Sequence, residues 1–187
     1  MTHAAADALF ISLPIAVLTV SDTRDLGSDT SGASLAEVLQ AAGHELADRR
    51  IVKDDIYAIR ATVSAWIADA EIAVILITGG TGFSGRDSTP EAVRVLFDKT
   101  VEGFGELFRQ VSLAEIGTST IQSRALAGLA NRTLICCLPG SNNACRTAWQ
   151  KIIEPQLDNR TRPCNFVPQL KPTARCPSRT ENPEEPA

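Results

Sequence analysis

Histidine is almost absent from this chain of 187 residues, which contains only His3 and His44. Imidazole is the usual acid–base group near neutral pH and a common metal ligand, so chemistry of that kind has little material here. His44 follows a glycine at a predicted helix-to-strand junction and is predicted to be an ordinary surface residue. The sequence also contains no Gly-Lys pair. A P-loop needs Gly-Lys followed by Ser or Thr at a helix start, so a classical P-loop NTPase is excluded.

Cysteine pairs and membrane segments are lacking as well. The five cysteines are an odd number and include no C-x-x-C spacing, so neither structural zinc nor a disulfide framework is expected. A signal peptide requires Lys or Arg before its apolar residues, and this N-terminus has neither, so it is not interpreted as a signal peptide. The apolar run 8–20 is broken by Ser12 and Pro14 and is too short to span a bilayer. We therefore expect a cytoplasmic protein without a membrane partner.

Positive charge is not in excess either. The chain has 18 Lys and Arg against 22 Asp and Glu, a net charge of -4, and no basic stripe, which argues against nucleic acid as a partner. Its length suits one domain, which we expect over residues 12–170. Residues 1–11 are interpreted as an N-terminal extension. The proline-rich segment 171–187 offers little to bury and is predicted to be a disordered C-terminal tail.

Apolar, β-branched runs alternate with helical patterns along the chain. Strands are predicted, in order, over residues 15–21, 45–52, 72–78, 125–129 and 133–138. Such alternation predicts an α/β fold with a mostly parallel sheet covered by helices on both faces. The loops after the strands then meet at one edge, where α/β proteins place ligands. The last two strands either pair as a hairpin through 130–132, or the second joins the main sheet alone.

Capping signals place the helices between these strands. The first helix is expected after residues 29–32, with a Ser34–Glu37 capping box and Gly43 at its end. Asp54 or Asp55 can cap the second helix. Later helices are predicted over residues 90–97, over 105–112 and after residue 143.

A glycine-rich turn follows the predicted strand 72–78 and is the most informative segment. Residues 78–82 read Thr-Gly-Gly-Thr-Gly, and Arg86 and Asp87 follow them. Glycines let the backbone approach a ligand and present N–H groups to an anion. Asp87 is then a carboxylate among anion-binding groups, where it is useful mainly for holding a cation such as Mg²⁺. The pattern predicts a nucleotide or phosphate site.

The helix after this turn should add N–H groups and a positive dipole end to the site. Thr89 is predicted to be its N-cap, with Pro90 at the first helical position. A Ser88–Glu91 capping box is the alternative.

Two other interpretations of the turn remain open. Residues 80–85 match the G-x-G-x-x-G pattern of dinucleotide-binding proteins. That pattern requires the helix to begin within the glycines of the first βαβ unit, whereas here residues 86–88 intervene and an earlier unit precedes. A tight turn without a ligand is the second alternative, although three closely spaced glycines beside Arg-Asp exceed what a turn requires.

A second strand-loop-helix junction, residues 138–143, reads Leu-Pro-Gly-Ser-Asn-Asn. With this junction and the glycine-rich turn in view, the chain resembles the MoaB/MogA molybdopterin-binding family of molybdenum cofactor biosynthesis over roughly residues 12–170. The motifs that carry the resemblance are Val20-Ser21, Asp29-Thr30-Ser31-Gly32, and segments 78–82, 86–87, 89–91, 102–106, 119–125 and 138–141. Segments 144–149 and 162–166 point to the MoaB branch. The resemblance implies a three-layer α/β/α domain that assembles as a homotrimer or a homohexamer, with other proteins of the cofactor pathway as candidate partners.

The resemblance also implies a reaction class. The adenylyltransferase branch joins the terminal phosphate of molybdopterin to the AMP part of ATP with Mg²⁺ and releases pyrophosphate. Such chemistry depends on positioning and charge neutralisation and needs no histidine base.

The motif matches assign residues to this site. Asp87 and Asp54 match the catalytic, metal-binding carboxylates, although a helix N-cap is the alternative role for Asp54. The nucleotide-cradling turn is matched by Gly79, Gly80, Thr81 and Gly82. Ser21, Ser31 and Gly32 are further ligand-binding residues, and Gly140 with Ser141 match the pterin-side junction. Arg124 and Arg146 either hold the pterin phosphate or are solvated surface residues.

One departure from the adenylyltransferase branch leaves two functions open. That branch usually continues its Leu-Pro-Gly with a polar residue and a second proline, whereas this chain has Ser141-Asn142-Asn143. The first hypothesis is a Mg²⁺-dependent molybdopterin adenylyltransferase using ATP or another purine nucleotide. The second is a binding or delivery protein for molybdopterin, and for a nucleotide, without efficient turnover. The paired carboxylates favour the enzyme, because a binder of two anions gains from added negative charge only when a cation is present.

Overall fold

A computed structural model describes residues 9–172 of the chain. Six strands form one sheet in the order β2-β1-β3-β6-β5-β4. Their bounds are β1 Pro14–Val20, β2 Glu45–Val52, β3 Val74–Thr78, β4 Lys99–Thr100, β5 Leu126–Ala130 and β6 Thr133–Leu138. The pairs β2–β1, β1–β3 and β3–β6 are parallel, while the pairs β6–β5 and β5–β4 are antiparallel. The predicted mostly parallel sheet is confirmed.

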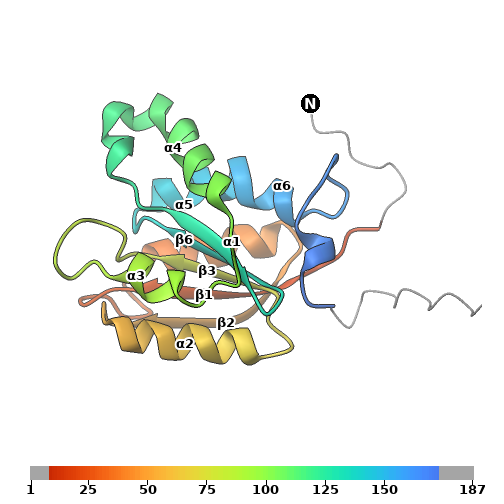
Figure 1. Ribbon diagram of the computed structural model, residues 1–187, viewed down its shortest axis with the longest axis horizontal. Coiled ribbons are helices and arrows are strands. Elements are labelled where there is room, and N and C mark those ends of the chain that lie inside the picture. The colour runs from red at the N-terminus through yellow and green to blue at the C-terminus, as the bar shows by residue number, and fades with distance from the viewer. Residues whose placement is uncertain (1–8, 173–187) are drawn as a thin grey trace, which may run out of the picture.

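Helices cover both faces of this sheet (Figure 1). They are α1 Thr30–Ala41, α2 Ile56–Ala68, α3 Thr89–Arg94, α4 Glu102–Ile116, α5 Asn142–Ala148 and α6 Glu154–Leu157. Helices α2 and α3 lie on one face, and α1, α4, α5 and α6 lie on the other. The fold is therefore the three-layer α/β/α arrangement that the sequence predicts.

Two cores result from the alternation of side chains along the buried strands. On β1, Ile15 and Val17 pack toward α1 and α4, whereas Ala16 and Leu18 pack toward α2 and α3. Because β1 and β3 are covered on both faces, nearly all of their residues are buried, which explains their continuous apolar sequences.

Of the two alternatives for the last two strands, the hairpin is confirmed, and the last strand does not join the main sheet alone. Strands β5 and β6 pair as a hairpin, and β6 also pairs with β3. Asn131 and Arg132 at the hairpin turn have φ values of 46° and 61°, as a tight turn of this hand requires.

Several local predictions are wrong. Asp29, not a Ser34–Glu37 box, caps α1, since its side chain accepts a hydrogen bond from the Gly32 N–H. Helix α4 is longer than the predicted 105–112, and the two-residue strand β4 was not foreseen. At α3, Ser88 rather than Thr89 occupies the N-cap position, and its hydroxyl does not cap the helix.

His44 is buried, contrary to the surface position predicted for it. Its Nδ1 accepts a hydrogen bond from the Leu13 N–H at 3.2 Å, and its ring lies against Phe10 and Trp149. Burial lowers the pKa of His44 to about 4, although the Asp158 carboxylate acts in the opposite direction. His44 is thus a neutral core residue at neutral pH.

The ends of the chain lie partly outside the described residues. Residues 1–8 of the predicted N-terminal extension and residues 173–187 of the predicted tail are not described. Lys171, which the sequence placed in the tail, contacts the domain: its Nζ donates to the carbonyl oxygens of Ile67 and Asp69 at 2.7 and 2.5 Å. Among the residues that are described, none of the helices has the length and apolarity needed to cross a membrane.

Candidate functional site

Three strand ends meet at the carboxyl edge of the sheet. Gly79, directly after β3, has φ +102°, and a side chain at this position would collide with the carbonyl oxygen of Val20 at the end of β1. Gly140, after β6, also lies close to Gly79, because a Cβ at residue 140 would lie 3.3 Å from the Gly79 Cα. The glycines at these two positions therefore let the connections after β1, β3 and β6 approach one another closely.

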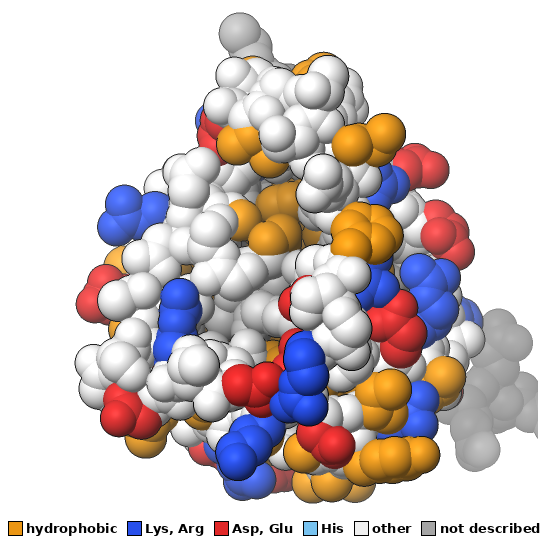
Figure 2. Space-filling view, turned by 90° about the vertical axis from the view of Figure 1, so that its left-hand side faces the viewer, with side chains coloured by type: hydrophobic (Ala, Val, Ile, Leu, Met, Phe, Trp, Pro, Cys, Tyr) orange, Lys and Arg blue, Asp and Glu red, His pale blue; other side chains and the backbone are white. Residues whose placement is uncertain are grey.

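A cavity of about 240 Å³ opens where these connections meet. Its lining residues are Thr19, Val20, Ser21, Thr23, Arg24, Ser31, Thr78, Gly79 and Gly140. The cavity thus joins Ser21, Ser31, Gly79 and Gly140, four of the residues that the sequence assigned to ligand binding. Figure 2 looks onto this edge and shows a hollow walled largely by backbone and uncharged polar groups, with charged side chains on its rim.

Arg24 is the only ionisable side chain among the residues lining this cavity, and the sequence analysis did not select it. Its Nη1 donates to the Ser31 hydroxyl at 3.0 Å. The nearby Asp29 carboxylate is held by Arg49 at 2.8 Å and by the Thr19 hydroxyl at 2.8 Å. Burial would raise the pKa of Asp29, but the hydrogen bonds from Arg49, Gly32 and Thr19 outweigh it and keep this pKa below its usual value.

Three other predicted binding residues, Gly32, Ser141 and Thr81, do not line this cavity. Gly32 lies in the first turn of α1, where any side chain would collide with Asp29 and Thr19. Ser141 is the N-cap of α5, and its hydroxyl accepts a hydrogen bond from the Ala144 N–H at 3.2 Å. Thr81 is buried within the glycine turn.

Two carboxylates lie against the glycine turn. A Cβ built on Gly80 would lie 2.6 Å from the Oδ2 of Asp54, and one built on Gly82 would lie 2.8 Å from the Oδ2 of Asp87. Asp54 and Asp87 come from different connections, after β2 and after β3. The structure therefore brings both predicted acidic residues to the same turn.

Each carboxylate is oriented by hydrogen bonds. Asp54 accepts from the Ser88 N–H at 3.0 Å and from the Ser88 hydroxyl at 2.7 Å. Asp87 accepts from the Ser84 N–H at 2.8 Å. Asp54 is not the N-cap of α2. Asp55 is, because its side chain accepts hydrogen bonds from the N–H groups of Tyr57 and Ala58.

Two arginines fasten the loop that carries Asp87. Arg86 pairs with Asp22 of the β1–α1 connection through contacts of 2.8–3.0 Å, and this pairing lowers the pKa of Asp22. Arg124 donates from Nε to the Thr81 carbonyl at 3.2 Å and from Nη2 to the Asp87 carbonyl at 3.0 Å. The Arg124 guanidinium is thus hydrogen-bonded to backbone carbonyls of this loop. The side chain of Arg146 is exposed on α5. Long-range contacts of this kind leave no local signal in the sequence.

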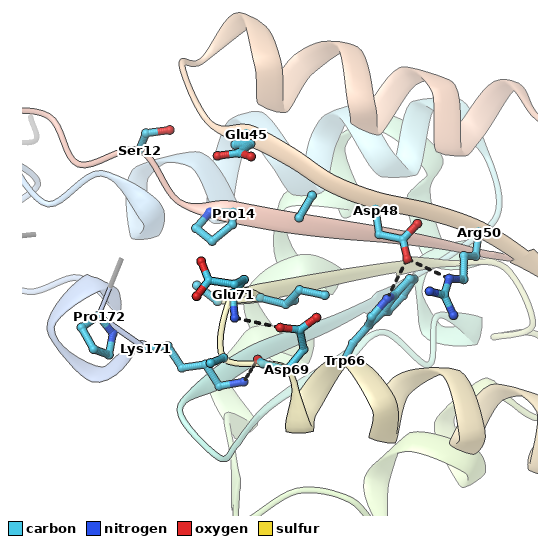
Figure 3. Close-up of a pocket in the computed structure, with 14 residues that line it drawn as sticks. Ser12, Pro14, Glu45, Asp48, Arg50, Trp66, Asp69, Glu71, Lys171 and Pro172 are labelled. Carbon is cyan, nitrogen blue, oxygen red and sulfur yellow. Dashed lines mark hydrogen bonds and ion pairs between the residues drawn. The ribbon is translucent and has the colours of Figure 1, made fainter. Parts of the chain in front are cut away.

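A separate pocket of about 420 Å³ lies at the amino ends of the parallel strands (Figure 3). Asp48 accepts hydrogen bonds there from Trp66 at 3.0 Å and from Arg50 at 2.7 Å, and Lys171 contributes to the wall. This pocket contains none of the residues assigned to ligand binding and lies opposite the edge with the glycine turn. The carboxyl edge is therefore the candidate site.

Fold and site together define a three-layer α/β/α protein with a glycine-lined pocket and paired carboxylates at the carboxyl edge of its parallel strands. Residues 16–159 match the model of a family described as "Probable molybdopterin binding domain". The chain belongs to this molybdenum cofactor biosynthesis family, as its motifs predict.

Individual relatives agree with this assignment. The chain is 61% identical over 162 residues to Molybdenum cofactor biosynthesis protein B of Escherichia coli strain K12, covering 87% of this chain and 95% of that one. It is 48% identical over 147 residues to the protein of the same name from Staphylococcus aureus strain COL, covering 77% and 87%.

Solved structures agree as well. A crystal structure of a Molybdenum cofactor biosynthesis protein B matches with a TM-score of 0.77 and 43% identity, covering 79% of this chain and 92% of that one. The MoaB structure from Thermus thermophilus matches with a TM-score of 0.67 and 36% identity, covering 75% and 89%.

Proposed function

We propose that this protein binds molybdopterin together with a magnesium–purine nucleotide and adenylylates molybdopterin with ATP. The observation that carries the proposal is the placement of Asp54 and Asp87 against Gly80 and Gly82 of one glycine turn. Backbone N–H groups of such a turn suit phosphate oxygens. Two carboxylates beside phosphates repel them unless a cation lies between, so the pair argues for a metal-bound nucleotide.

The residues fit one particular mode of magnesium binding, in which the protein supplies only some of the ligands. Within residues 9–172, no group of three His, Cys, Asp or Glu side chains could hold a metal ion alone. Magnesium usually binds through one or two carboxylates together with substrate phosphates and water, which matches a pair such as Asp54 and Asp87. When bound, the ion would neutralise charge on the phosphates of the nucleotide.

In the proposed reaction, an oxygen of the terminal phosphate of molybdopterin attacks the α-phosphorus of ATP. The bond from that phosphorus to the bridging oxygen breaks, and pyrophosphate leaves with the electron pair. The glycine turn would hold the nucleotide phosphates, while Ser21, Ser31, Arg24 and Gly140 would hold the pterin side. The chain's contribution is positioning and electrostatic stabilisation, for which no histidine base is needed.

The adjoining cavity supports the pterin assignment. Its hydroxyl groups and the Arg24 guanidinium offer donors to a phosphate monoester such as the one at the end of molybdopterin. Because Gly79 of the glycine turn also lines this cavity, a ligand in the cavity lies beside one on the turn. Adjacent binding of two phosphate-bearing ligands is what a transfer between them requires.

A binding or delivery role without efficient turnover is the second candidate. It is favoured by the side chains that follow Ser141: Asn142 accepts a hydrogen bond from Thr30 at 3.1 Å, and Asn143 donates to Glu115 at 2.7 Å. These amides are engaged within the protein, so this junction contributes fewer free polar groups to a reaction.

One incubation separates the two functions. The protein is mixed with molybdopterin, MgATP and inorganic pyrophosphatase, and the products are analysed for adenylylated pterin. Product formation that disappears on removal of Mg²⁺ supports the enzyme. If calorimetry shows that both ligands bind but no product forms, the result supports delivery. If neither ligand binds, both candidate functions are refuted.

A further inference from the structure

Phe83 is an aromatic side chain in an unusual position. It directly follows Gly82 in the glycine turn, and 71% of its surface is exposed to solvent. A large aromatic side chain is normally buried because its exposure to water is unfavourable. The other described phenylalanines are at least half-buried, so Phe83 is distinctive among them.

The ring of Phe83 is supported on one side. The Arg124 Cζ lies 5.3 Å from its centroid, a cation–π distance. Arg124 is itself fixed by hydrogen bonds to the carbonyl oxygens of Thr81 and Asp87 and by an ion pair with Glu91. The guanidinium therefore backs the ring from a fixed position beside the turn, while the exposed surface of the ring remains available.

We propose that Phe83 is the stacking platform for the purine base of the bound nucleotide. This inference rests on the proposed function, since it requires a nucleotide whose phosphates lie on residues 79–82. A base is joined to its phosphates through the ribose, so an aromatic ring one residue from Gly82 is within reach of it. The resulting stack would be guanidinium, phenyl ring and purine.

The proposal predicts the nucleotide preference. Stacking recognises the face of a base and not its hydrogen-bonding edge, so it discriminates poorly between bases of equal size. Purines offer more stacking area than pyrimidines. We therefore expect ATP and GTP to bind with similar affinity, and both to bind more tightly than UTP or CTP.

Tyr57 provides a matched comparison on the same molecule. It is 75% exposed and lies 5.8 Å from the Arg60 Cζ, so it too is an exposed ring backed by an arginine. It lies in the first turn of α2 and is not part of the glycine turn. Exposure and a cation–π contact are thus common to both residues, and of the two only Phe83 adjoins the glycine turn.

The test combines four variants with five ligands. Phe83→Ala, Phe83→Trp, Tyr57→Ala and Tyr57→Trp are titrated calorimetrically with MgATP, MgGTP, MgUTP, MgCTP and magnesium tripolyphosphate. We expect Phe83→Ala to weaken the binding of MgATP and MgGTP by about 5- to 160-fold, the range typical of base–aromatic stacking. Tripolyphosphate should bind as it does to the unmodified protein. Tyr57→Ala should change none of the affinities.

The tryptophan variants supply a direct signal. The natural Trp66 and Trp149 are buried and serve as a constant background. Indole fluorescence of Phe83→Trp should be quenched by MgATP but not by tripolyphosphate, and that of Tyr57→Trp should respond to neither.

Each other outcome overturns a specific statement. If the unmodified protein binds no MgATP, the proposed nucleotide function itself fails. If it binds MgATP but Phe83→Ala binds equally well, or loses ATP and tripolyphosphate to the same extent, stacking on Phe83 is refuted. Fluorescence quenching seen only in Tyr57→Trp would show that the base binds beside α2 and not beside Phe83. An altered oligomer mass of Phe83→Ala with unchanged affinity would assign the ring to a subunit contact instead.

Discussion

Asp54 accepts two hydrogen bonds from Ser88, one from its backbone N–H at 3.0 Å and one from its hydroxyl at 2.7 Å. These bonds join the connection after β2 to the start of α3 and hold the Asp54 carboxylate beside Gly80. The hydroxyl of Ser88 is therefore engaged by Asp54 and does not cap its own helix. The carboxylate is oriented before any ligand binds.

The first prediction concerns the charge of the second carboxylate. Asp87→Asn keeps an oxygen that can accept the hydrogen bond from the Ser84 N–H, but it removes the negative charge. We expect the melting temperature to change little and Mg²⁺-dependent nucleotide binding to weaken about tenfold or more, which corresponds to at least about 1.4 kcal/mol. Calorimetric titration with ATP, with and without Mg²⁺, measures both.

Asp69→Asn is the matched control, because Asp69 lies at the pocket on the opposite edge of the sheet. It should leave nucleotide binding unchanged. Unaltered Mg²⁺ dependence in Asp87→Asn would contradict a metal-binding role for this residue.

Sequence patterns predict the site where its parts are local. The glycine turn, Asp87 and the start of α3 fall within one short segment, so their proximity follows from the chain itself. The partners that orient them do not: Ser88 is 34 residues from Asp54, and Arg124 is 37 residues from Asp87. Such contacts depend on how the layers pack, which no local pattern encodes.

The errors in the fold have the same origin. His44 is polar and follows Gly43, which favours a surface position, yet Phe10 and Trp149 from distant segments enclose it. Asp29 caps α1 because Thr19 and Arg49, on two strands, hold its carboxylate at the helix start. Strand β4 has two residues, too few to show a period.

The second prediction concerns pH. His44 has a pKa of about 4 in the folded protein, against an ordinary value of 6.5 in the unfolded chain. Below pH 6.5 the unfolded chain therefore binds more protons, so the stabilising contribution present above pH 6.5 is lost as the pH falls toward 4. The loss from this group at pH 5 should be about 2 kcal/mol, from 1.36 kcal/mol per unit.

Urea unfolding at pH 7 and pH 5 measures this loss. The variant His44→Gln retains an acceptor for the Leu13 N–H but cannot become charged in this pH range. Between pH 7 and pH 5, the free energy of unfolding of this variant should fall less than that of the unmodified protein. Parallel pH profiles for both proteins would contradict the linkage.

The third prediction concerns assembly. Segment 101–112 is rich in apolar residues that could pack between subunits, but its Phe104 and Phe108 belong to the protein's own core. Exposed apolar side chains remain on α4 and the turn that follows it, which Figure 1 shows projecting beyond the sheet. They are Leu107, Leu113, Ile116 and Ile121. We expect these residues to pack between subunits of a homotrimer.

Light scattering at micromolar concentration should therefore give three times the 20.0 kDa chain mass, or six times if trimers pair. The double variant Leu113→Ser with Ile121→Ser should reduce this mass, whereas Leu26→Ser, an exposed leucine elsewhere, should not. A mass of 20.0 kDa for the unmodified protein would refute assembly.

The fourth prediction compares two truncations. Ending the chain after Pro172 keeps the hydrogen bonds of Lys171 to the carbonyl oxygens of Ile67 and Asp69, and its backbone bond to Arg132. This truncation should change the free energy of unfolding by less than about 0.5 kcal/mol. Ending it after Leu170 removes these bonds and should cost about 1–3 kcal/mol. Equal stability of the two truncated chains, by urea unfolding, would show that Lys171 contributes nothing.

The last prediction separates the two sides of the candidate site. Gly82→Val places a branched side chain against the Asp87 carboxylate, because even a Cβ at this position would lie 2.8 Å from its Oδ2. The carboxylate must move and the turn is obstructed, so nucleotide binding should be strongly weakened. Gly140, on the pterin side, is unaffected by this change, so molybdopterin binding should remain measurable.

Ser141→Ala is the complementary change on the other side. It removes the hydroxyl that caps α5 through the Ala144 N–H, at a cost of about 0.5–2 kcal/mol in stability. Molybdopterin binding should weaken by at most about tenfold, the effect of losing one hydrogen bond, with nucleotide affinity nearly unchanged. Titrating each variant with each ligand gives four affinities. If both variants weaken the same ligand equally, the two sides are one shared pocket, and the assignment of nucleotide to the glycine turn and pterin to the Gly140–Ser141 junction is wrong.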